Sequence, residues 1–198
     1  MTELFLLRHG ESVWNAEHRY QGQQGTGLSA RGRQQAKDAA GYLQSYDFDE
    51  IVASDLQRVT ETLQPYVDTL DHPAVRIDKR WREIDVGTWG GRTFADVYAE
   101  EADVVDAFAR GEDVARGGGE TFRQLRARVW EAMQEITRGG VRRVLVVTHG
   151  GPIRVATAAA LNLPAGAELV LDPPGNCSLT TLRLDGLTTY NVPTGVDR

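Results

Sequence analysis

The chain has little cysteine, no long apolar run and fewer positive than negative charges. Cys177 is the one cysteine among 198 residues, which excludes an intrachain disulfide and a cysteine-rich zinc site. No apolar run approaches the roughly 20 residues of a membrane-spanning helix. The N-terminus has neither a basic segment nor a long apolar core, so we expect no signal peptide. These absences favour a cytoplasmic protein that does not contact a membrane.

The charge balance restricts the kinds of ligand. The 22 lysines and arginines are outnumbered by 28 aspartates and glutamates, which gives a net charge of −6 at pH 7. An acidic surface does not favour nucleic acid or anionic lipid, so a site for a phosphorylated molecule must create its own positive field. With 41% hydrophobic and 25% charged residues, the composition is that of a globular protein, and we expect a single domain over residues 1–198.

Two apolar segments end in the same way. Residues 4–7 lead into Arg8 and His9, and residues 144–147 lead into a threonine and His149; a glycine follows each histidine. Short apolar runs predict buried strands, and open α/β sheets bind ligands at the carboxyl ends of their strands. If these two strands are neighbours, two imidazoles face one pocket beside the Arg8 guanidinium. That combination suits a doubly negative oxyanion such as a phosphate.

The rest of the chain alternates between predicted strands and helices. The strands are expected at residues 2–8, 51–53, 75–77, 143–148, 168–171, 177–184 and 187–192. Helices are expected after the capping residues Ser29, Ser54, Thr93 and Thr121 and from 150 to about 161, with Pro65 interrupting the second of them. This alternation predicts an α/β fold, a three-layer architecture with a mostly parallel sheet and helices on both faces. Residues 92–120 are interpreted as a small helical cap insertion.

The histidines differ in their surroundings. His9 and His149 have matched contexts, which favours a shared site, whereas His18 lies in a polar loop and His72 precedes a proline, so both are expected to be exposed and inert. A neutral imidazole can act as a nucleophile and form a covalent intermediate. Arg8 and Arg58 can neutralise the oxygens of a phosphoryl group, although Arg58 could equally be a solvated arginine on a helix surface.

A leaving alkoxide also needs a proton donor, and Glu83 is the best candidate. Its neighbours Trp81, Ile84 and Trp89 predict apolar surroundings that would raise the pKa of the carboxyl group; the alternative is an ordinary surface carboxylate. No cluster has metal-ligand spacing, and neither a phosphate-binding loop nor a dinucleotide fingerprint is present. We therefore expect chemistry without a metal or a cofactor.

Six segments in order resemble the histidine phosphatase superfamily, the group that includes the cofactor-dependent phosphoglycerate mutases. They are Arg8-His9-Gly10-Glu11-Ser12 with Asn15, Gln21-Gly22-Gln23, Ser54-Asp55-Leu56-Gln57-Arg58 with Thr62, residues 82–91 around Glu83, Gly118-Gly119-Glu120-Thr121, and Val146-Val147-Thr148-His149-Gly150-Gly151. The resemblance implies that His9 is the phosphorylated nucleophile and that Glu83 acts as general acid and base. Phosphate contacts are implied for Arg8, Arg58, His149, Asn15, Gln21, Gly22 and Gly150.

Departures from the family pattern bear on the activity. Where members often continue Asp-x-Pro-Leu-Thr, this chain has Gly25-Thr26-Gly27-Leu28-Ser29, which could loosen the entrance. Mutases carry a longer insertion with a lysine and an Arg-Arg pair, whereas residues 92–120 contain no lysine and no adjacent arginines, and six acidic residues lie between positions 100 and 113 alone. Arg92, Arg110 and Arg116 could contact a second anionic group or pair with these acids.

The departures favour a metal-independent, acid-type histidine phosphatase that acts on a small-molecule phosphate ester. The alternatives are a cofactor-dependent phosphoglycerate mutase and a non-catalytic phospho-ligand-binding module on the same fold. Sugar phosphates, phosphoglycerate derivatives, nucleotides and phosphoprotein all stay open as substrates. Whether the chain forms a homodimer is also left open, because the late strands could provide a pairing edge.

Overall fold

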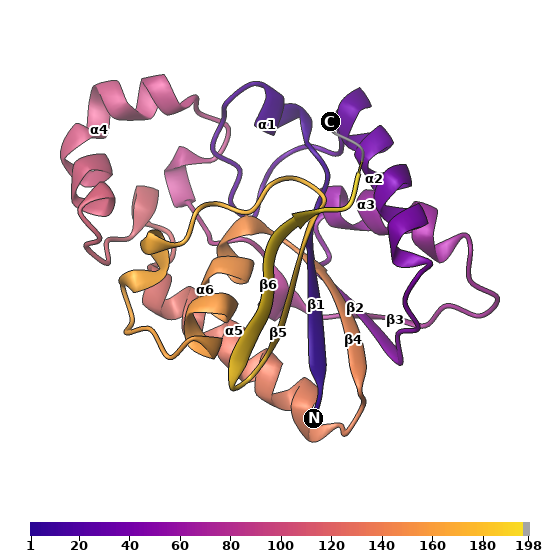
Figure 1. The fold of residues 1–198 in the computed structure, drawn as a ribbon. Coiled ribbons are helices and arrows are strands. Elements are labelled where there is room, and N and C mark those ends of the chain that lie inside the picture. The colour runs from indigo at the N-terminus through magenta and orange to yellow at the C-terminus, as the bar shows by residue number, and fades with distance from the viewer. Residues whose placement is uncertain (196–198) are drawn as a thin grey trace.

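The computed structural model describes residues 1–195 and contains a six-stranded sheet in the order β3-β2-β4-β1-β5-β6 (Figure 1). The strands are β1 (Glu3–Arg8), β2 (Glu50–Ala53), β3 (Val75–Ile77), β4 (Arg143–Thr148), β5 (Ser178–Arg183) and β6 (Gly186–Pro193). The first four pair in parallel, and β5 and β6 add two antiparallel pairings at one side. The sheet is therefore mostly parallel, as expected.

Helices cover both faces of the sheet. The α-helices are α1 (Val13–Ala16), α2 (Ala30–Leu43), α3 (Gln57–Val67), α4 (Phe94–Ala109), α5 (Phe122–Arg138) and α6 (Gly150–Ala160). Four 3₁₀ turns are η1 (Lys79–Trp81), η2 (Gly87–Trp89), η3 (Arg116–Gly118) and η4 (Ala167–Val170). Leu4 and Leu6 of β1 pack with α5 and α6, whereas the alternate residues Phe5 and Leu7 pack with α2 and α3. Since successive side chains of a strand point to opposite faces, this alternation confirms the three-layer architecture.

The helix starts follow the predicted caps in three cases. The side chains of Ser29, Thr93 and Thr121 accept backbone N–H groups at the starts of α2, α4 and α5, and Thr121 forms a full capping box with Gln124. The prediction for Ser54 is wrong, because α3 begins after Leu56 without a side-chain cap. The Ser54 hydroxyl instead lies 2.9 Å from Nε2 of His149.

Two further local predictions are wrong. Helix α3 continues through Pro65 to Val67; the proline removes a single hydrogen bond near the end of the helix, where the adjoining Tyr66 is buried in the core. Residues 168–171 form no strand, and η4 lies there instead. The reason is Glu168, which is 1% exposed and ion-paired with Arg126 at 3.0 Å, so this polar residue anchors a turn.

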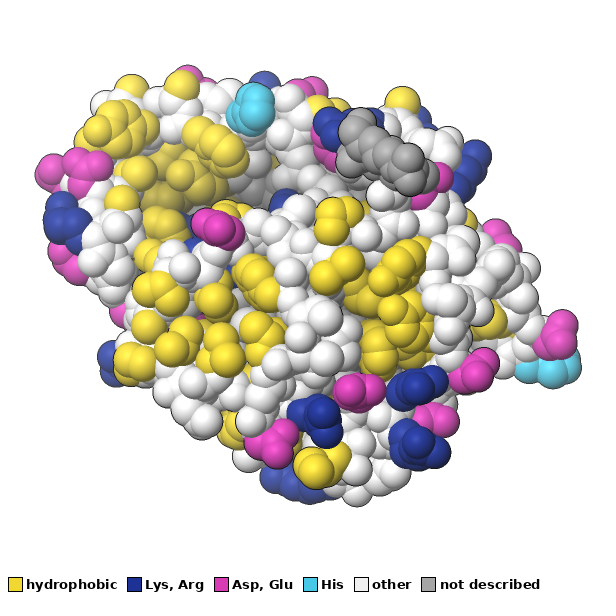
Figure 2. Space-filling view, in the orientation of Figure 1, with side chains coloured by type: hydrophobic (Ala, Val, Ile, Leu, Met, Phe, Trp, Pro, Cys, Tyr) yellow, Lys and Arg dark blue, Asp and Glu magenta, His cyan; other side chains and the backbone are white. Residues whose placement is uncertain are grey.

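Residues 92–120 form a helical cap built from α4 and η3. In Figure 1, α4 lies at the same end of the molecule as the carboxyl ends of β1 and β4. The helix is bent at Glu101, whose backbone is not helical. Val97 is buried against the core, while Phe94 and Tyr98 are exposed. In the space-filling view of Figure 2, apolar side chains gather along this region beside the hollow at the end of the sheet.

Two glycines of α2 offer a matched test of the packing between this helix and the loop after β1. A Cβ atom at Gly32 would lie 1.9 Å from the carbonyl oxygen of Glu11, whereas one at Gly41 would meet nothing within 4 Å. We expect Gly32→Ala to lower the free energy of unfolding by about 1–3 kcal/mol through overpacking. Gly41→Ala should raise it by roughly 0.5–1 kcal/mol through helix propensity. Urea unfolding midpoints measure both, and shifts of the same sign would contradict this packing.

Candidate active site

The site begins with two histidines that follow neighbouring strands. Strands β1 and β4 pair in parallel with Arg8 opposite Thr148, so the next residues, His9 and His149, emerge side by side. Their ring centroids are 5.1 Å apart in an edge-on arrangement with an interplanar angle of 63°. The expected adjacency of the two segments is thus confirmed, and it brings together residues 140 positions apart in the chain.

The hydrogen bonds of His9 define which ring nitrogen is free of a proton. Nδ1 lies 2.7 Å from the carbonyl oxygen of Gly10; because a carbonyl only accepts, Nδ1 carries the hydrogen. Nε2 then presents a lone pair and accepts from Nε of Arg58 at 3.3 Å. Burial lowers the pKa of His9 well below its usual value, and the charges of Arg58 and Arg8 lower it further. His9 is therefore a neutral imidazole with an available Nε2.

Arg58 is a built part of the site, not a surface arginine. It is 2% exposed, and its terminal nitrogens donate to the carbonyls of Gly22 at 2.7 Å and Gln24 at 2.8 Å. Burial lowers the pKa of Arg58 to about 10, opposed by the charge of Glu83, so the guanidinium remains charged at neutral pH. Because backbone oxygens hold it, its charge is not cancelled by a partner carboxylate.

Arg8 is held in a similar way from the other side. Its Nη1 donates to the carbonyl of Pro174 at 2.5 Å, and among residues 1–195 its buried Nε has no hydrogen-bond partner. Burial lowers the pKa of Arg8, and the Glu83 charge opposes that shift. An unpartnered donor on a partly buried cation is a group that a bound anion would satisfy.

The loop after β1 supplies polar groups through tight local structure. Asn15 completes a capping box with Ser12 at the start of α1, and the Ser12 hydroxyl donates to the amide oxygen of Gln21 at 2.8 Å. Gly22 adopts φ +55°, and a Cβ atom there would lie 2.7 Å from Cγ2 of Val86. Only glycine fits this close approach of the loop to Val86. In this conformation the Gly22 carbonyl accepts a hydrogen bond from Arg58.

Glu83 lies in polar surroundings, so the apolar setting expected for it is wrong. Its Oε1 accepts the backbone N–H of Ile84 at 2.9 Å and of Gly151 at 3.1 Å. Trp81 and Trp89 are completely buried in the core that α5 and α6 share. The backbone between Trp81 and Glu83 is extended at Arg82, and in extended chain successive side chains point in opposite directions. Of the three expected neighbours, Ile84 contacts Glu83 through its backbone N–H, whereas neither Trp81 nor Trp89 lines the cavity with it.

Arg128 of α5 positions the segment that carries Glu83. Its guanidinium donates to the carbonyls of Arg80, Arg82 and Glu83 at 2.6–2.8 Å and pairs with Glu120 at 2.8 Å. Glu120 in turn accepts the backbone N–H of Asp85. Sequence analysis missed Arg128, and no local signal could have found it, because its partners are backbone carbonyls of a distant segment.

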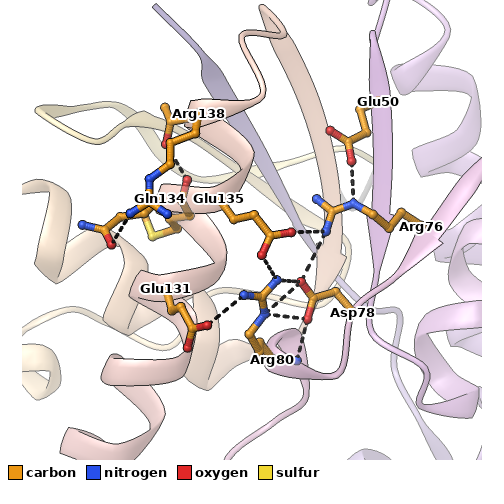
Figure 3. Close-up of polar contacts among 10 residues, drawn as sticks. Glu50, Arg76, Asp78, Arg80, Glu131, Gln134, Glu135 and Arg138 are labelled. Atoms are coloured by element: carbon orange, nitrogen blue, oxygen red, sulfur yellow. Dashed lines mark hydrogen bonds and ion pairs between the residues drawn. The ribbon is translucent and has the colours of Figure 1, made fainter.

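An ion-pair network at the other end of the same segment joins it to β3 and α5 (Figure 3). Arg80 pairs with Asp78 at 2.7 Å and with Glu135 of α5 at 2.7 Å, and Arg76 pairs with Glu50 at 2.6 Å. Burial opposes the ionisation of Asp78, but hydrogen bonds from Arg80 outweigh it and hold the pKa of Asp78 below its usual value. The turn before Glu83 is thus anchored from two sides.

A cavity of about 280 Å³ collects the predicted residues. Its lining includes eight of the nine: Arg8, His9, Asn15, Gln21, Gly22, Arg58, Glu83 and Gly150. The ninth, His149, is completely buried beside His9; its Nε2 lies by Ser54, and its Nδ1 has no partner within residues 1–195. Arg19, Arg116 and Arg154 also line the cavity, so five arginines face a single glutamate and create a local positive field on an acidic protein.

The remaining residues are placed as follows. His18 and His72 are both exposed, as predicted. Within residues 1–195, no helix is long and apolar enough to cross a membrane. In the same part of the chain, no three or more His, Cys, Asp or Glu side chains are grouped so that they could hold a metal ion.

A neutral imidazole flanked by fixed guanidinium groups, at the carboxyl end of a parallel sheet, is an arrangement suited to phosphoryl transfer. The profile of the histidine phosphatase superfamily (branch 1) matches residues 4–191. The chain therefore belongs to that superfamily, as its sequence motifs predicted.

Named relatives resemble the chain along most of its length. It is 37% identical to a glucosyl-3-phosphoglycerate phosphatase of Mycolicibacterium vanbaalenii over 94% of this chain and 88% of that protein. It is 34% identical to a probable phosphoglycerate mutase, GpmB, of Enterobacter sp. over 92% of this chain and 85% of that protein. The structure of a mycobacterial glucosyl-3-phosphoglycerate phosphatase in complex with VO3 matches with a TM-score of 0.88 and 33% identity, covering 97% of this chain and all of that one.

Arg128 does not line the cavity, so its removal should displace Glu83 without removing a side chain from the cavity wall. We expect Arg128→Met to lower kcat for phosphate-ester hydrolysis by about 100-fold, since small displacements of a reacting group are that costly. Arg123→Met is the matched control, because Arg123 lies on the same helix with 78% of its side chain exposed. Circular dichroism at the assay temperature checks that both variants are folded, and equal rates in the two would contradict the positioning role of Arg128.

The two buried imidazoles predict a loss of stability in acid. Burial lowers the pKa of both His9 and His149, so below the unfolded value of about 6.5 the unfolded chain binds more protons than the folded one. The free energy of unfolding is unaffected by them above that pH. Below it, the free energy should fall by up to about 1.4 kcal/mol per pH unit for each histidine.

Urea unfolding between about pH 7.5 and about pH 5.5 measures this dependence. His9→Asn should flatten the curve, because one buried titrating group is removed. His72→Asn, at an exposed position, should leave it unchanged. A wild-type curve that stays level through this range would show that the imidazoles accept protons in the folded state.

Proposed function

We propose that the protein is a phosphomonoester hydrolase that works through a phosphohistidine intermediate at His9. The observation that carries the proposal is the state of the His9 ring. Its Nδ1 hydrogen is bound to the carbonyl of Gly10, so the lone pair of Nε2 is available beside the Arg58 guanidinium. A nucleophile that is already deprotonated needs no base to activate it.

In the first step, Nε2 of His9 attacks the phosphorus atom of the ester and the bond from phosphorus to the leaving oxygen breaks. Arg8 and Arg58 balance the charge on the phosphoryl oxygens. Asn15, Gln21 and the N–H of Gly150 at the start of α6 can donate further hydrogen bonds, and the unpartnered Nδ1 of His149 can serve the same group.

Glu83 supplies and recovers the proton. Its Oε1 is engaged by two backbone N–H groups, whereas Oε2 has one longer contact to Gly151 at 3.3 Å, so Oε2 is the oxygen suited to proton transfer. In this mechanism a protonated Glu83 gives its proton to the leaving oxygen. The carboxylate then takes a proton from the water that attacks the phosphohistidine, which releases inorganic phosphate and restores both groups.

Hydrolysis is favoured over the mutase activity named for some relatives. In the cap, Arg92 pairs with Glu100 at 2.7 Å and Glu101 at 3.1 Å, and Arg110 pairs with Glu112 at 2.9 Å. Of the three cap arginines in the described residues this leaves Arg116 alone without an ion pair, whereas the mutase insertion has a lysine and two adjacent arginines. Relatives named as phosphatases support the same choice. A mutase would be stimulated by 2,3-bisphosphoglycerate, and a non-catalytic module would bind esters without releasing phosphate.

The test is hydrolysis of p-nitrophenyl phosphate with EDTA present. We expect turnover by the intact protein that survives EDTA, and loss of about 1,000-fold or more in His9→Ala, because the covalent route is closed. His72→Ala, an exposed histidine, is the control. Normal turnover in His9→Ala would refute the phosphohistidine mechanism, and loss of activity with EDTA would refute metal independence.

The role of Glu83 predicts a dependence on the leaving group. Glu83→Gln keeps the shape of the side chain but removes its exchangeable acid proton. We expect a fall of roughly 100- to 10,000-fold in kcat for an alkyl phosphate and a much smaller fall for p-nitrophenyl phosphate, whose leaving group needs little protonation. Equal losses for the two esters would place Glu83 outside the proton transfer.

A further inference from the structure

Three arginines besides Arg8 and Arg58 line the cavity. Arg19 is ion-paired with Glu17 at 2.8 Å, which leaves Arg116 and Arg154 as a second pair that the phosphoryl chemistry does not use. Arg116 belongs to η3 of the cap, and Arg154 lies in α6, one turn beyond the glycines that follow His149. Both line the same cavity as His9 and Glu83. Because the two arginines lie on separate elements, only the tertiary structure brings them into one cavity.

Arg116 differs from the other arginines of the cap. Arg92 and Arg110 are ion-paired with acidic neighbours, whereas Arg116 stacks on the rings of Phe108 at 4.6 Å and Phe122 at 5.2 Å. Its Nε is buried and has no hydrogen-bond partner among residues 1–195. The two rings orient the guanidinium without forming an ion pair with it, in a cap (residues 92–120) that contains eight acidic residues.

Arg154, like Arg116, forms no ion pair with a carboxylate among residues 1–195. One terminal nitrogen donates to the carbonyl of Leu171 at 2.7 Å, and its buried Nε also lacks a partner in the described part of the chain. Burial lowers the pKa of both arginines; at Arg116 the charge of Glu83 opposes this lowering and the charge of Arg154 adds to it. Two partly buried like charges within range of each other are unfavourable, and a shared anion would relieve that repulsion.

We propose that Arg116 and Arg154 form a subsite for a second anionic group of the substrate, a carboxylate or a second phosphate. This inference rests on the proposed phosphatase function and narrows it to small phosphate esters that carry another negative charge. Guanidinium groups bind both anions through paired hydrogen bonds. A cavity of about 280 Å³ has room for a small phosphate ester that reaches both subsites.

Matched substrates test the subsite. In the first pair, 3-phosphoglycerate carries a carboxylate where glycerol 3-phosphate has a hydroxymethyl group. In the second pair, fructose 1,6-bisphosphate carries a second phosphate that fructose 6-phosphate lacks. We expect kcat/KM to be about ten- to 100-fold higher for the doubly anionic member of at least one pair, the range that a charge-assisted hydrogen bond provides. The pair that shows the preference identifies the second group.

Variants assign the preference to the two arginines. Arg116→Met and Arg154→Met should each remove most of it through a higher KM, while kcat/KM for the singly anionic ester stays within about twofold of wild type. Arg116→Lys should recover part of the loss, because lysine keeps the positive charge but cannot form the paired hydrogen bonds of a guanidinium group. Arg110→Met removes a charge from the same cap at an exposed ion pair and should change nothing.

The outcomes separate this inference from the proposed function. If p-nitrophenyl phosphate is hydrolysed but neither pair of esters shows a preference, the subsite is overturned and the phosphatase proposal stands. The same conclusion follows if the arginine variants lose activity equally toward both members of a pair. If no ester is hydrolysed, the phosphatase proposal fails. Calorimetric titration of His9→Ala with the same four esters then decides the subsite: tighter binding of a doubly anionic ester, lost on adding Arg116→Met, supports it, and equal binding refutes it.

Discussion

The parallel pairing of β1 with β4 is the contact on which the rest of the site depends. It sets Arg8 opposite Thr148, and the imidazoles of His9 and His149 then lie 5.1 Å apart. A slip of one residue in this register would turn each side chain to the other face of the sheet. The alternating burial of β1 against two different helix layers opposes any such slip, so core packing fixes the geometry of the chemistry.

The site concentrates positive charge on a protein that is acidic as a whole. Arg8, Arg58 and Arg154 are held by the carbonyls of Pro174, Gly22, Gln24 and Leu171, and Arg116 packs against the rings of Phe108 and Phe122. Carbonyls and rings orient a guanidinium without neutralising it, so these arginines stay available to an anion. Electrostatic stabilisation of this kind depends on charges that are already in place when the ligand arrives.

The cap and the segment that carries Glu83 form one connected unit. A Cβ atom at Gly87 would lie 2.0 Å from the Gly117 carbonyl oxygen, and one at Gly119 would lie 2.3 Å from that of Asp85, so the glycine run of η3 packs directly on the turn beyond Glu83. Glu120 continues this contact by pairing with Arg128, which also holds the carbonyl of Glu83. The element that carries Arg116 is therefore fixed relative to Glu83.

The sequence alone determined the elements that arise from local pattern. Apolar runs located β1 and β4, capping residues located the starts of α2, α4 and α5, and the motifs around His9, Arg58 and His149 identified the superfamily, because such signals lie within a few neighbouring residues. Tertiary structure alone decided the partners. Ser54 binds His149 instead of capping a helix, Glu83 accepts the backbone N–H of Gly151, and Arg128 reaches the Glu83 segment from a distant helix. These contacts join segments far apart in the chain, where neither helical nor strand periodicity carries information.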